Sequence, residues 1–176
     1  MQEILYNSME KRKLYNAYER HEGYYCFGCA QANSHGLQCE FYDEGEYVTC
    51  RWMPRREFQG FFNVLHGGIQ ATLMDELACW TVFAKAQSAG VTVGMEVKYR
   101  NTVHTNKGEL FLRSKIVENT GRLVKMHVEL FNTDGVLGSE AEVVYRVFPE
   151  EVAARKLGWT GIDAFYSGEL RVESGE

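Results

Sequence analysis

A pair of carboxylates lies in an otherwise apolar segment that opens with two glycines. Gly67 and Gly68 begin the segment, and Asp75 and Glu76 are its only charged side chains before Lys85. The other residues are apolar on nearly every side of the predicted helix, which is the pattern of a buried helix. Burying an unpaired carboxylate is costly, and desolvation raises the pKa of a carboxyl group toward the range useful for base chemistry. The pair therefore predicts a functional site.

The start of the predicted helix offers an anion site. Its first-turn amides have no intrahelical acceptors, and Gly67 and Gly68 carry no side chain that would hinder a close approach. A substrate carbonyl at the Gly67 amide would develop oxyanion character there. Asp75 lies about 12 Å further along the axis, at roughly 1.5 Å per residue, so both groups cannot act on one carbonyl within one chain. We therefore expect a homodimer in which Gly67 of one chain faces Asp75 of the other.

Three motifs carry a family resemblance. Phe58-Gln59-Gly60 precedes His66-Gly67-Gly68 and Asp75, Cys26-Phe27-Gly28-Cys29 leads through Asn33 to Gly36-Leu37, and Gly90-Val91-Thr92-Val93 leads to Tyr99. Over about residues 24–148, this pattern resembles the hotdog-fold acyl-CoA thioesterases of the phenylacetate-pathway and 4-hydroxybenzoyl-CoA type. The resemblance implies hydrolysis of an acyl-CoA or acyl-carrier thioester without a cofactor. It leaves open whether dimers pair into a homotetramer.

The resemblance also implies roles for individual residues. The catalytic carboxylate falls on Asp75, as general base or as nucleophile, the oxyanion-hole amide on Gly67, and a hydroxyl near the acid on Thr92. The motif histidine falls on His66, which either fixes the turn before the helix by hydrogen bonding or transfers a proton. Glu76 is a further candidate acid, but successive helix positions diverge by about 100°, so it and Asp75 cannot share one task.

Other candidates surround the helix start. Some relatives carry an asparagine six residues before the motif histidine, where this chain has Gly60, and the nearby Asn63 is a candidate substitute. Gly68 is expected to lie against the substrate. Five aromatic residues either line an acyl pocket or belong to the core: Phe58, Phe61, Phe62, Trp80 and Phe83.

Cationic side chains in or beside the later strands are candidate partners for the phosphates of coenzyme A. They are Arg100, Lys107, Arg113 and Arg122. Alternatively, these side chains are ordinary solvated charges on the protein surface. Two other functions stay open: a non-catalytic acyl-CoA-binding hotdog module, since fold alone does not decide catalysis, and a hotdog hydratase or dehydratase. The latter is disfavoured because the chain lacks a His-Phe-Pro motif.

Composition indicates one ordinary globular domain. The chain has 176 residues, of which 45% are hydrophobic, and this length suffices for a core without disulfides or metals. The net charge of −5 argues against nucleic acid as a ligand. No segment reads as a membrane span or a signal peptide, so we expect a cytoplasmic protein.

The cysteines suggest a metal site only weakly. Cys26, Cys29, His35 and Cys39 come within one residue of a zinc-knuckle spacing, but strand alternation assigns Cys39 to the core. A redox pair at Cys26 and Cys29 lacks the usual βαβ context. We expect reduced structural thiols, a turn at this segment, and no bound metal.

The elements form an α+β pattern, in which an antiparallel β-sheet wraps around one long central helix. We expect an N-terminal helical extension over residues 1–23, with its helix over 2–20, the hotdog thioesterase domain over 24–148, and a C-terminal helical appendage with a frayed tail over 149–176. The central helix should run from near His66 to before Gly90. Strands are predicted near 37–43, 46–53, 91–103, 108–118, 122–132 and 136–148.

Overall fold

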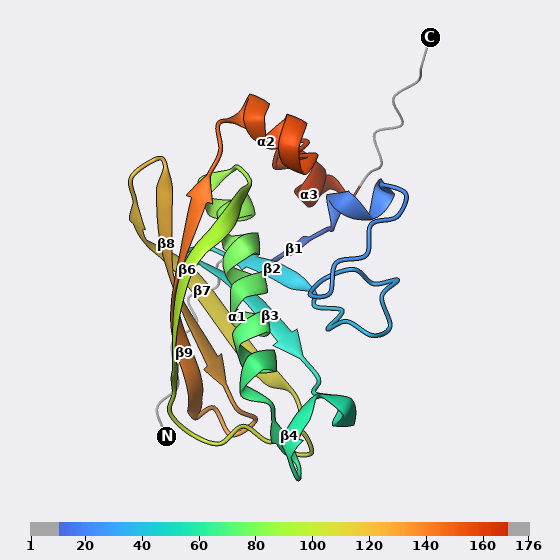
Figure 1. Cartoon of the computed structure of the whole chain (residues 1–176), viewed down its shortest axis with the longest axis vertical. Coiled ribbons are helices and arrows are strands. Elements are labelled where there is room, and N and C mark those ends of the chain that lie inside the picture. Colours follow the sequence, from blue (N-terminus) through green and yellow to red (C-terminus); the bar gives the residue numbers. More distant parts are fainter. Residues whose placement is uncertain (1–10, 169–176) are drawn as a thin grey trace.

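The structure, a computed structural model, describes residues 11–168. A seven-stranded antiparallel sheet curves around one long helix, α1 (Gly67–Thr81), as Figure 1 shows. In spatial order the strands are β1 (Arg12–Leu14), β2 (Phe41–Glu44), β3 (Tyr47–Trp52), β7 (Leu110–Asn119), β8 (Leu123–Phe131), β9 (Leu137–Val147) and β6 (Gly90–Tyr99). The α+β architecture expected from the sequence is confirmed.

Helix α1 forms the centre of the core. Its residues Leu73, Met74, Leu77 and Ala78 are almost fully buried, and Trp80 stacks on Phe41 of β2 with 4.5 Å between ring centroids. The helix continues as a π-helical segment, η3 (Val82–Ala86), and ends where Gln87 adopts a left-handed conformation with φ +51°. The nearly all-round apolar sequence of α1 thus reflects its enclosure by the sheet and the flanking segments.

A short hairpin delivers the chain into α1. The 3₁₀ turn η2 (Arg56–Phe58) leads into β4 (Gln59–Phe61), which pairs with β5 (Val64–Leu65). Asn63 occupies the turn with φ +57°, a conformation that asparagine tolerates better than most residues. The Leu65 N–H then donates to the Val103 carbonyl, which fixes the chain directly before α1.

The helix predicted over residues 2–20 is wrong for its described part, residues 11–20. These residues form β1 and a 3₁₀ turn, η1 (Ala17–Arg20). Strand β1 pairs with β2, and Leu14 is thereby buried opposite Phe41. An exposed sheet edge offers backbone partners and an apolar surface together, which local helical periodicity does not reveal. Residues 2–10 of the expected helix lie outside the described residues.

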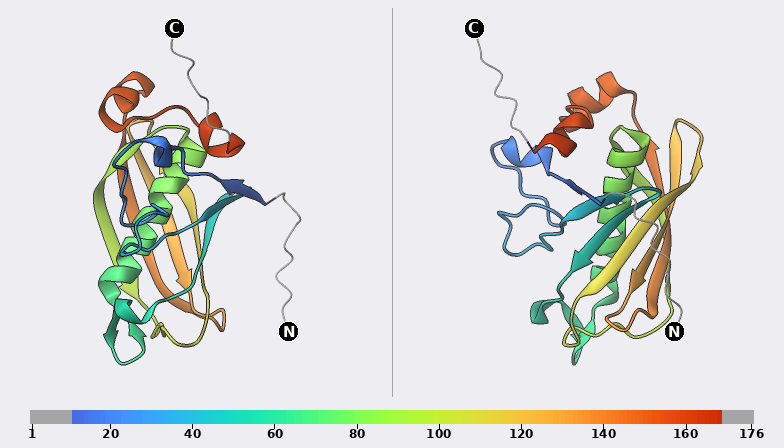
Figure 2. Two further views of the ribbon diagram at one scale, coloured as in Figure 1. Left: turned by 90° about the vertical axis from the view of Figure 1, so that its right-hand side faces the viewer. Right: turned by 180° about the vertical axis from the view of Figure 1, so that it is seen from behind.

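The predicted C-terminal helix is confirmed and a shorter one follows. Helix α2 (Glu150–Leu157) begins after Pro149 and ends at Gly158, whose φ is +66°. Helix α3 (Asp163–Ser167) places Phe165 against Phe83, and the Tyr15 N–H donates to the Phe165 carbonyl. Both helices lie beside η1 at the far end of α1 from its N-terminus (Figures 1 and 2). Most of the predicted frayed tail lies outside the described residues. Within residues 11–168, no helix combines the length and apolar character that crossing a bilayer requires.

Candidate active site

Asp75 lies half-buried on the side of α1 that faces β6 and β9. Its Oδ1 accepts a hydrogen bond from the Thr92 hydroxyl at 2.9 Å and one from the Tyr145 hydroxyl at 3.2 Å. Thr92 and Tyr145 are directly paired across β6 and β9, so their side chains share one face of the sheet. Burial raises the pKa of the Tyr145 phenol, which therefore remains a protonated donor. The carboxylate is oriented by two hydroxyl groups on a rigid pair of strands.

At the start of α1, His66 fixes the turn by hydrogen bonding, which is one of the two roles predicted for it. His66 is the N-cap residue, and its Nδ1 accepts from the Gly68 N–H at 2.9 Å. Within the described part of the chain, the Gly67 N–H donates no hydrogen bond. The Tyr99 hydroxyl donates to the Gly67 carbonyl at 2.8 Å and so ties the first helical residue to β6. The turn thus leaves an unused amide at the helix N-terminus, where negative charge is stabilised.

Glu76 points away from Asp75, as the angular spacing predicted. The Trp80 indole Nε1 donates to Glu76 Oε1 at 3.2 Å, and the Cys26 Sγ lies 3.7 and 3.8 Å from the two carboxylate oxygens. Burial raises the pKa of Glu76 to about 7. The two acids therefore contact different regions. Asp75 bonds to strands β6 and β9, whereas Glu76 contacts the N-terminal turn. Within residues 11–168, the hydrogen bonds of Glu76 join it to Trp80 and Cys26 and not to the start of α1.

The aromatic residues divide into core and surface groups. Phe58, Trp80 and Phe83 are buried, which is the core alternative of the sequence analysis. Phe61 and Phe62 are 82% and 94% exposed at the tip of the β4–β5 hairpin. A single chain therefore does not assemble these five rings into one acyl pocket.

The two arginines predicted to bind substrate lie at different pockets. Arg100 lies with Gly67 and Tyr99 at a pocket of about 390 Å³, and its guanidinium pairs with Glu140 at 2.6 Å. Arg122 lies at another pocket, of about 710 Å³, beside the end of η3 and the start of α2. The two arginines thus lie toward opposite ends of α1.

Asn63 and Gly68 both lie exposed near the helix start. The Asn63 carbonyl accepts from the Thr105 N–H at 2.9 Å, so its backbone closes the hairpin, while the Gly68 N–H is occupied by His66.

Two tyrosines hold Asp75 and Gly67 in place, and the sequence did not indicate this role for either of them. Tyr145 holds Asp75 and Tyr99 holds Gly67, although they lie 70 and 32 residues away in the chain. Tyr99 ends the third sequence motif, whereas Tyr145 looks like an ordinary strand residue. The register of β6 against β9 would have been needed to identify it.

The sequence of residues 62–139 matches the family profile of the thioesterase superfamily. Residues 62–139 are a thioesterase-superfamily segment in a hotdog fold. The recognition made from the sequence motifs is thereby confirmed. The match supports thioester hydrolysis in general terms. It covers α1 and Asp75, and it includes the Gly67 amide and Thr92.

Solved structures share the hotdog fold at low sequence identity. A thioesterase superfamily protein is 20% identical over 65% of this chain and 56% of its own, with a TM-score of 0.59. Thioesterase superfamily member 2 of zebra fish is 21% identical over 67% of this chain and 91% of its own, with a TM-score of 0.58. A hypothetical thioesterase from Streptococcus pneumoniae, solved with coenzyme A, is 19% identical over 60% of this chain and 80% of its own, with a TM-score of 0.55.

This chain covers little more than half the length of the first of these structures. No curated protein sequence matches it.

Proposed function

We propose that this hotdog protein hydrolyses an acyl-CoA or acyl-carrier thioester to the free acid and the thiol. The observation that carries the proposal is the Asp75 carboxylate, held half-buried by Thr92 and Tyr145 on the same helix that begins with the unused Gly67 amide. A carboxylate and an amide donor supply the proton acceptor and the oxyanion stabiliser that acyl transfer requires. The coenzyme A in the pneumococcal structure supports the choice of carrier.

The chemistry has two forms. As a general base, Asp75 takes a proton from water while the water oxygen bonds to the thioester carbon. The carbonyl oxygen becomes an oxyanion at the Gly67 N–H, and its collapse breaks the C–S bond, with the proton passing to the leaving sulfur. As a nucleophile, an Asp75 carboxylate oxygen bonds to the same carbon and the C–S bond breaks to expel a thiolate, which takes a proton from solvent. Water then hydrolyses the mixed anhydride, which releases the acid and restores the Asp75 carboxylate.

Two copies of the chain are needed in this proposal. Gly67 and Asp75 are eight residues apart, or about 12 Å along the helix axis. Strand β6 is an edge strand of the sheet, opposite the β1 edge, and its Val91 and Val93 are 41% and 49% exposed. An edge strand with exposed valines suits pairing with a second copy, which would bring Gly67 of one protomer to Asp75 of its partner. Phe61, Phe62, Arg100 and Arg122 would then approach the substrate from two chains.

Thiol release from a panel of short, medium, long and aryl acyl-CoA substrates tests the activity and the role of Asp75. Asp75→Asn keeps the shape of the side chain and should lower kcat/KM by about 10²- to 10⁴-fold. Asp134→Asn is the matched control, because Asp134 is exposed in the β8–β9 turn, and it should leave the activity unchanged. A wild type that is silent on the panel, yet has a raised melting temperature with acyl-CoA, would instead indicate a binding module.

Gly67→Pro tests the amide and the shared site. Proline is favoured at the first helical position, and His66 has φ −59° and ψ +134°, which suits a residue before proline. The variant removes the N–H, whereas Gly67→Ala keeps it and adds a comparable crowding near Tyr99. Gly67→Pro should lose activity relative to Gly67→Ala.

Mixing separately inactive Gly67→Pro and Asp75→Asn chains should restore about a quarter of the wild-type activity. In a shared site, about half the dimers are mixed and each has one intact site. No restoration after subunit exchange would show that the site lies within one chain.

A further inference from the structure

Three side chains that could bind a soft cation converge where the N-terminal turn meets α1. They are Cys26, Cys29 and Glu76, and one ligand atom from each lies within 4.8 Å of the other two. Both cysteines belong to the turn before β2, and Glu76 arrives from the helix 47 residues after Cys29. This set differs from the sequence-based knuckle, because His35 is exposed and Cys39 is buried in the core. Glu76 lies outside the zinc-knuckle spacing of the sequence, 37 residues after Cys39.

Glu76 lacks a cationic partner in this setting. Among residues 11–168, no lysine, arginine or histidine forms an ion pair with it. Its neighbours include the Trp80 N–H and the Cys26 thiol, and neither carries a positive charge. A carboxylate that is partly withdrawn from water gains from pairing with a cation or coordinating a metal, since burial of an isolated charge is unfavourable.

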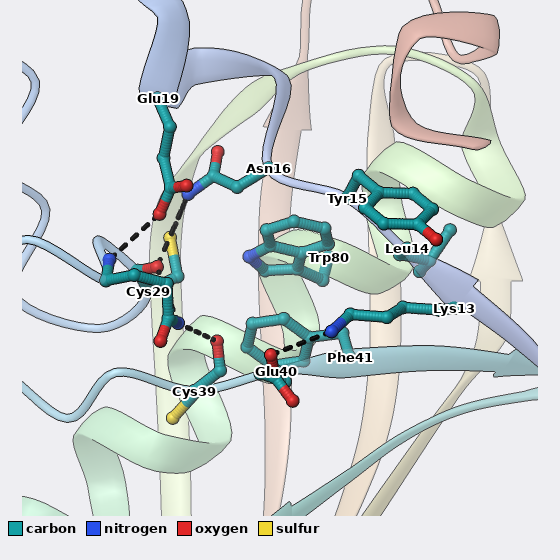
Figure 3. Close-up of a pocket in the computed structure, with 11 residues that line it drawn as sticks. Lys13, Leu14, Tyr15, Asn16, Glu19, Cys29, Cys39, Glu40, Phe41 and Trp80 are labelled. Carbon is teal, nitrogen blue, oxygen red and sulfur yellow. Dashed lines mark hydrogen bonds and ion pairs between the residues drawn. The ribbon is translucent and has the colours of Figure 1, made fainter. Parts of the chain in front are cut away.

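The backbone around the two thiols resembles a built coordination sphere. The Gly28 N–H donates to Cys26 Sγ at 3.3 Å, the kind of outer hydrogen bond that stabilises a thiolate ligand. Asn16 Nδ2 lies 3.4 Å from Cys29 Sγ, and Figure 3 shows its side chain pointing toward Cys29 at a small pocket that Trp80 also lines. A Cβ at Gly28 would come within 3.0 Å of the Glu76 carboxylate. The absence of a side chain at Gly28 therefore lets the carboxylate reach the thiols.

The separation between Cys26 and Glu76 fits zinc. Zn–S bonds of about 2.3 Å and Zn–O bonds of about 2.1 Å in a tetrahedron place sulfur and oxygen ligands roughly 3.6 Å apart. The Cys26 Sγ and Glu76 oxygens are 3.7 and 3.8 Å apart. Cys26 and Glu76 are only partly buried, so a cation can enter from solvent.

We propose that Cys26, Cys29 and Glu76 bind one zinc ion, which ties the N-terminal turn to the middle of α1. Binding displaces the protons of both thiols to solvent, together with that of the Glu76 carboxyl group where it is protonated. Three protein ligands leave the fourth tetrahedral position to water. Because Glu76 is adjacent to Asp75, the ion fixes the segment of α1 that carries the candidate catalytic carboxylate without touching the substrate. The zinc site is inferred independently of the proposed thioester hydrolysis.

Metal binding by the full chain tests the proposal without an activity readout. Protein purified with a phosphine reductant and stripped with a chelator is titrated with zinc chloride in competition with a chromophoric chelator. One equivalent should bind per chain, and cobalt should give a thiolate-to-metal charge-transfer band in the near ultraviolet. Cys26→Ser leaves Cys29 as the one thiolate ligand of the proposed site, so it should weaken zinc binding at least about tenfold and remove about half of that band. Zinc should also raise the melting temperature of the wild type.

Two further variants keep the test decisive. Glu76→Gln removes one ligand but leaves both thiols, so it should weaken zinc binding even if Cys26→Ser fails to fold. Cys50→Ala removes a buried cysteine of β3 outside the cluster and should bind zinc within about twofold of the wild type. Absence of zinc binding by the wild type overturns the proposal. So does equal binding by Glu76→Gln and Cys50→Ala, or a Cys26–Cys29 disulfide that persists in the presence of zinc and reductant.

Discussion

The contact between Gly28 and Glu76 gives a sharp prediction about stability. Gly28 does not adopt a left-handed φ, so alanine fits its backbone. An added Cβ would nevertheless come within 3.0 Å of Cγ, Cδ and Oε2 of Glu76, closer than real Cβ contacts. The Gly28→Ala substitution must therefore displace the Glu76 side chain from its hydrogen bond with Trp80.

The expected loss follows from two opposing effects. Overpacking of this kind costs about 1–3 kcal/mol, whereas alanine gains about 0.4–1 kcal/mol by restricting the unfolded chain. The net loss in the free energy of unfolding should be about 1–2 kcal/mol. For a chain of this size, that corresponds to a decrease in melting temperature of roughly 2–8 °C.

A double-mutant cycle isolates the contact. Glu76→Ala removes all three crowded atoms, so Gly28→Ala should cost nothing, or stabilise slightly, in that background. The unfolded-state gain of alanine cancels between the two backgrounds, so the coupling energy should equal the overpacking cost, about 1–3 kcal/mol. Urea unfolding of the four proteins in the presence of EDTA measures it, with the chelator excluding any contribution from bound metal. An equal cost of Gly28→Ala in both backgrounds would refute the reasoning, because the penalty would then arise elsewhere in the turn.

Three further predictions concern other contacts. Thr92→Val keeps the shape of the side chain but removes the 2.9 Å hydrogen bond to Asp75, so kcat/KM for thiol release should decrease about tenfold, and an unchanged value would contradict the orienting role. Gly138→Ala would bring a Cβ within 3.0 Å of Val103, so it should lower the free energy of unfolding in urea by about 1–3 kcal/mol. In a Val103→Ala background much of that loss should disappear. Lys85→Met removes an ammonium that donates to Asp43 and to the Gly45 carbonyl, both at 2.5 Å; it should cost about 1–3 kcal/mol, and an identical melting temperature would show that the pair contributes nothing.

The long central helix and the strands after it were predictable because their signals are local. The apolar stretch from Gly67 onward, the alternation in the later strands and the Gly158 cap each appear within a few residues of sequence. The same holds for the turn-fixing role of His66, since its Nδ1 reaches an amide two residues away. The divergence of Asp75 and Glu76 also follows from helical geometry alone.

Contacts between distant segments were decided by the tertiary structure. Residues 12–14 add to the sheet because an unpaired edge and Phe41 are available there, although the local pattern suggested a helix. Tyr145 reaches Asp75 because β9 pairs with β6 in one register, and Glu76 reaches Cys26 because the N-terminal turn packs on α1. The sequence thus determined the candidate carboxylates and the helix that presents them, since these depend on residue type and local periodicity. Which partners each carboxylate meets depends on strand register and packing, and these arise only when the whole chain is folded.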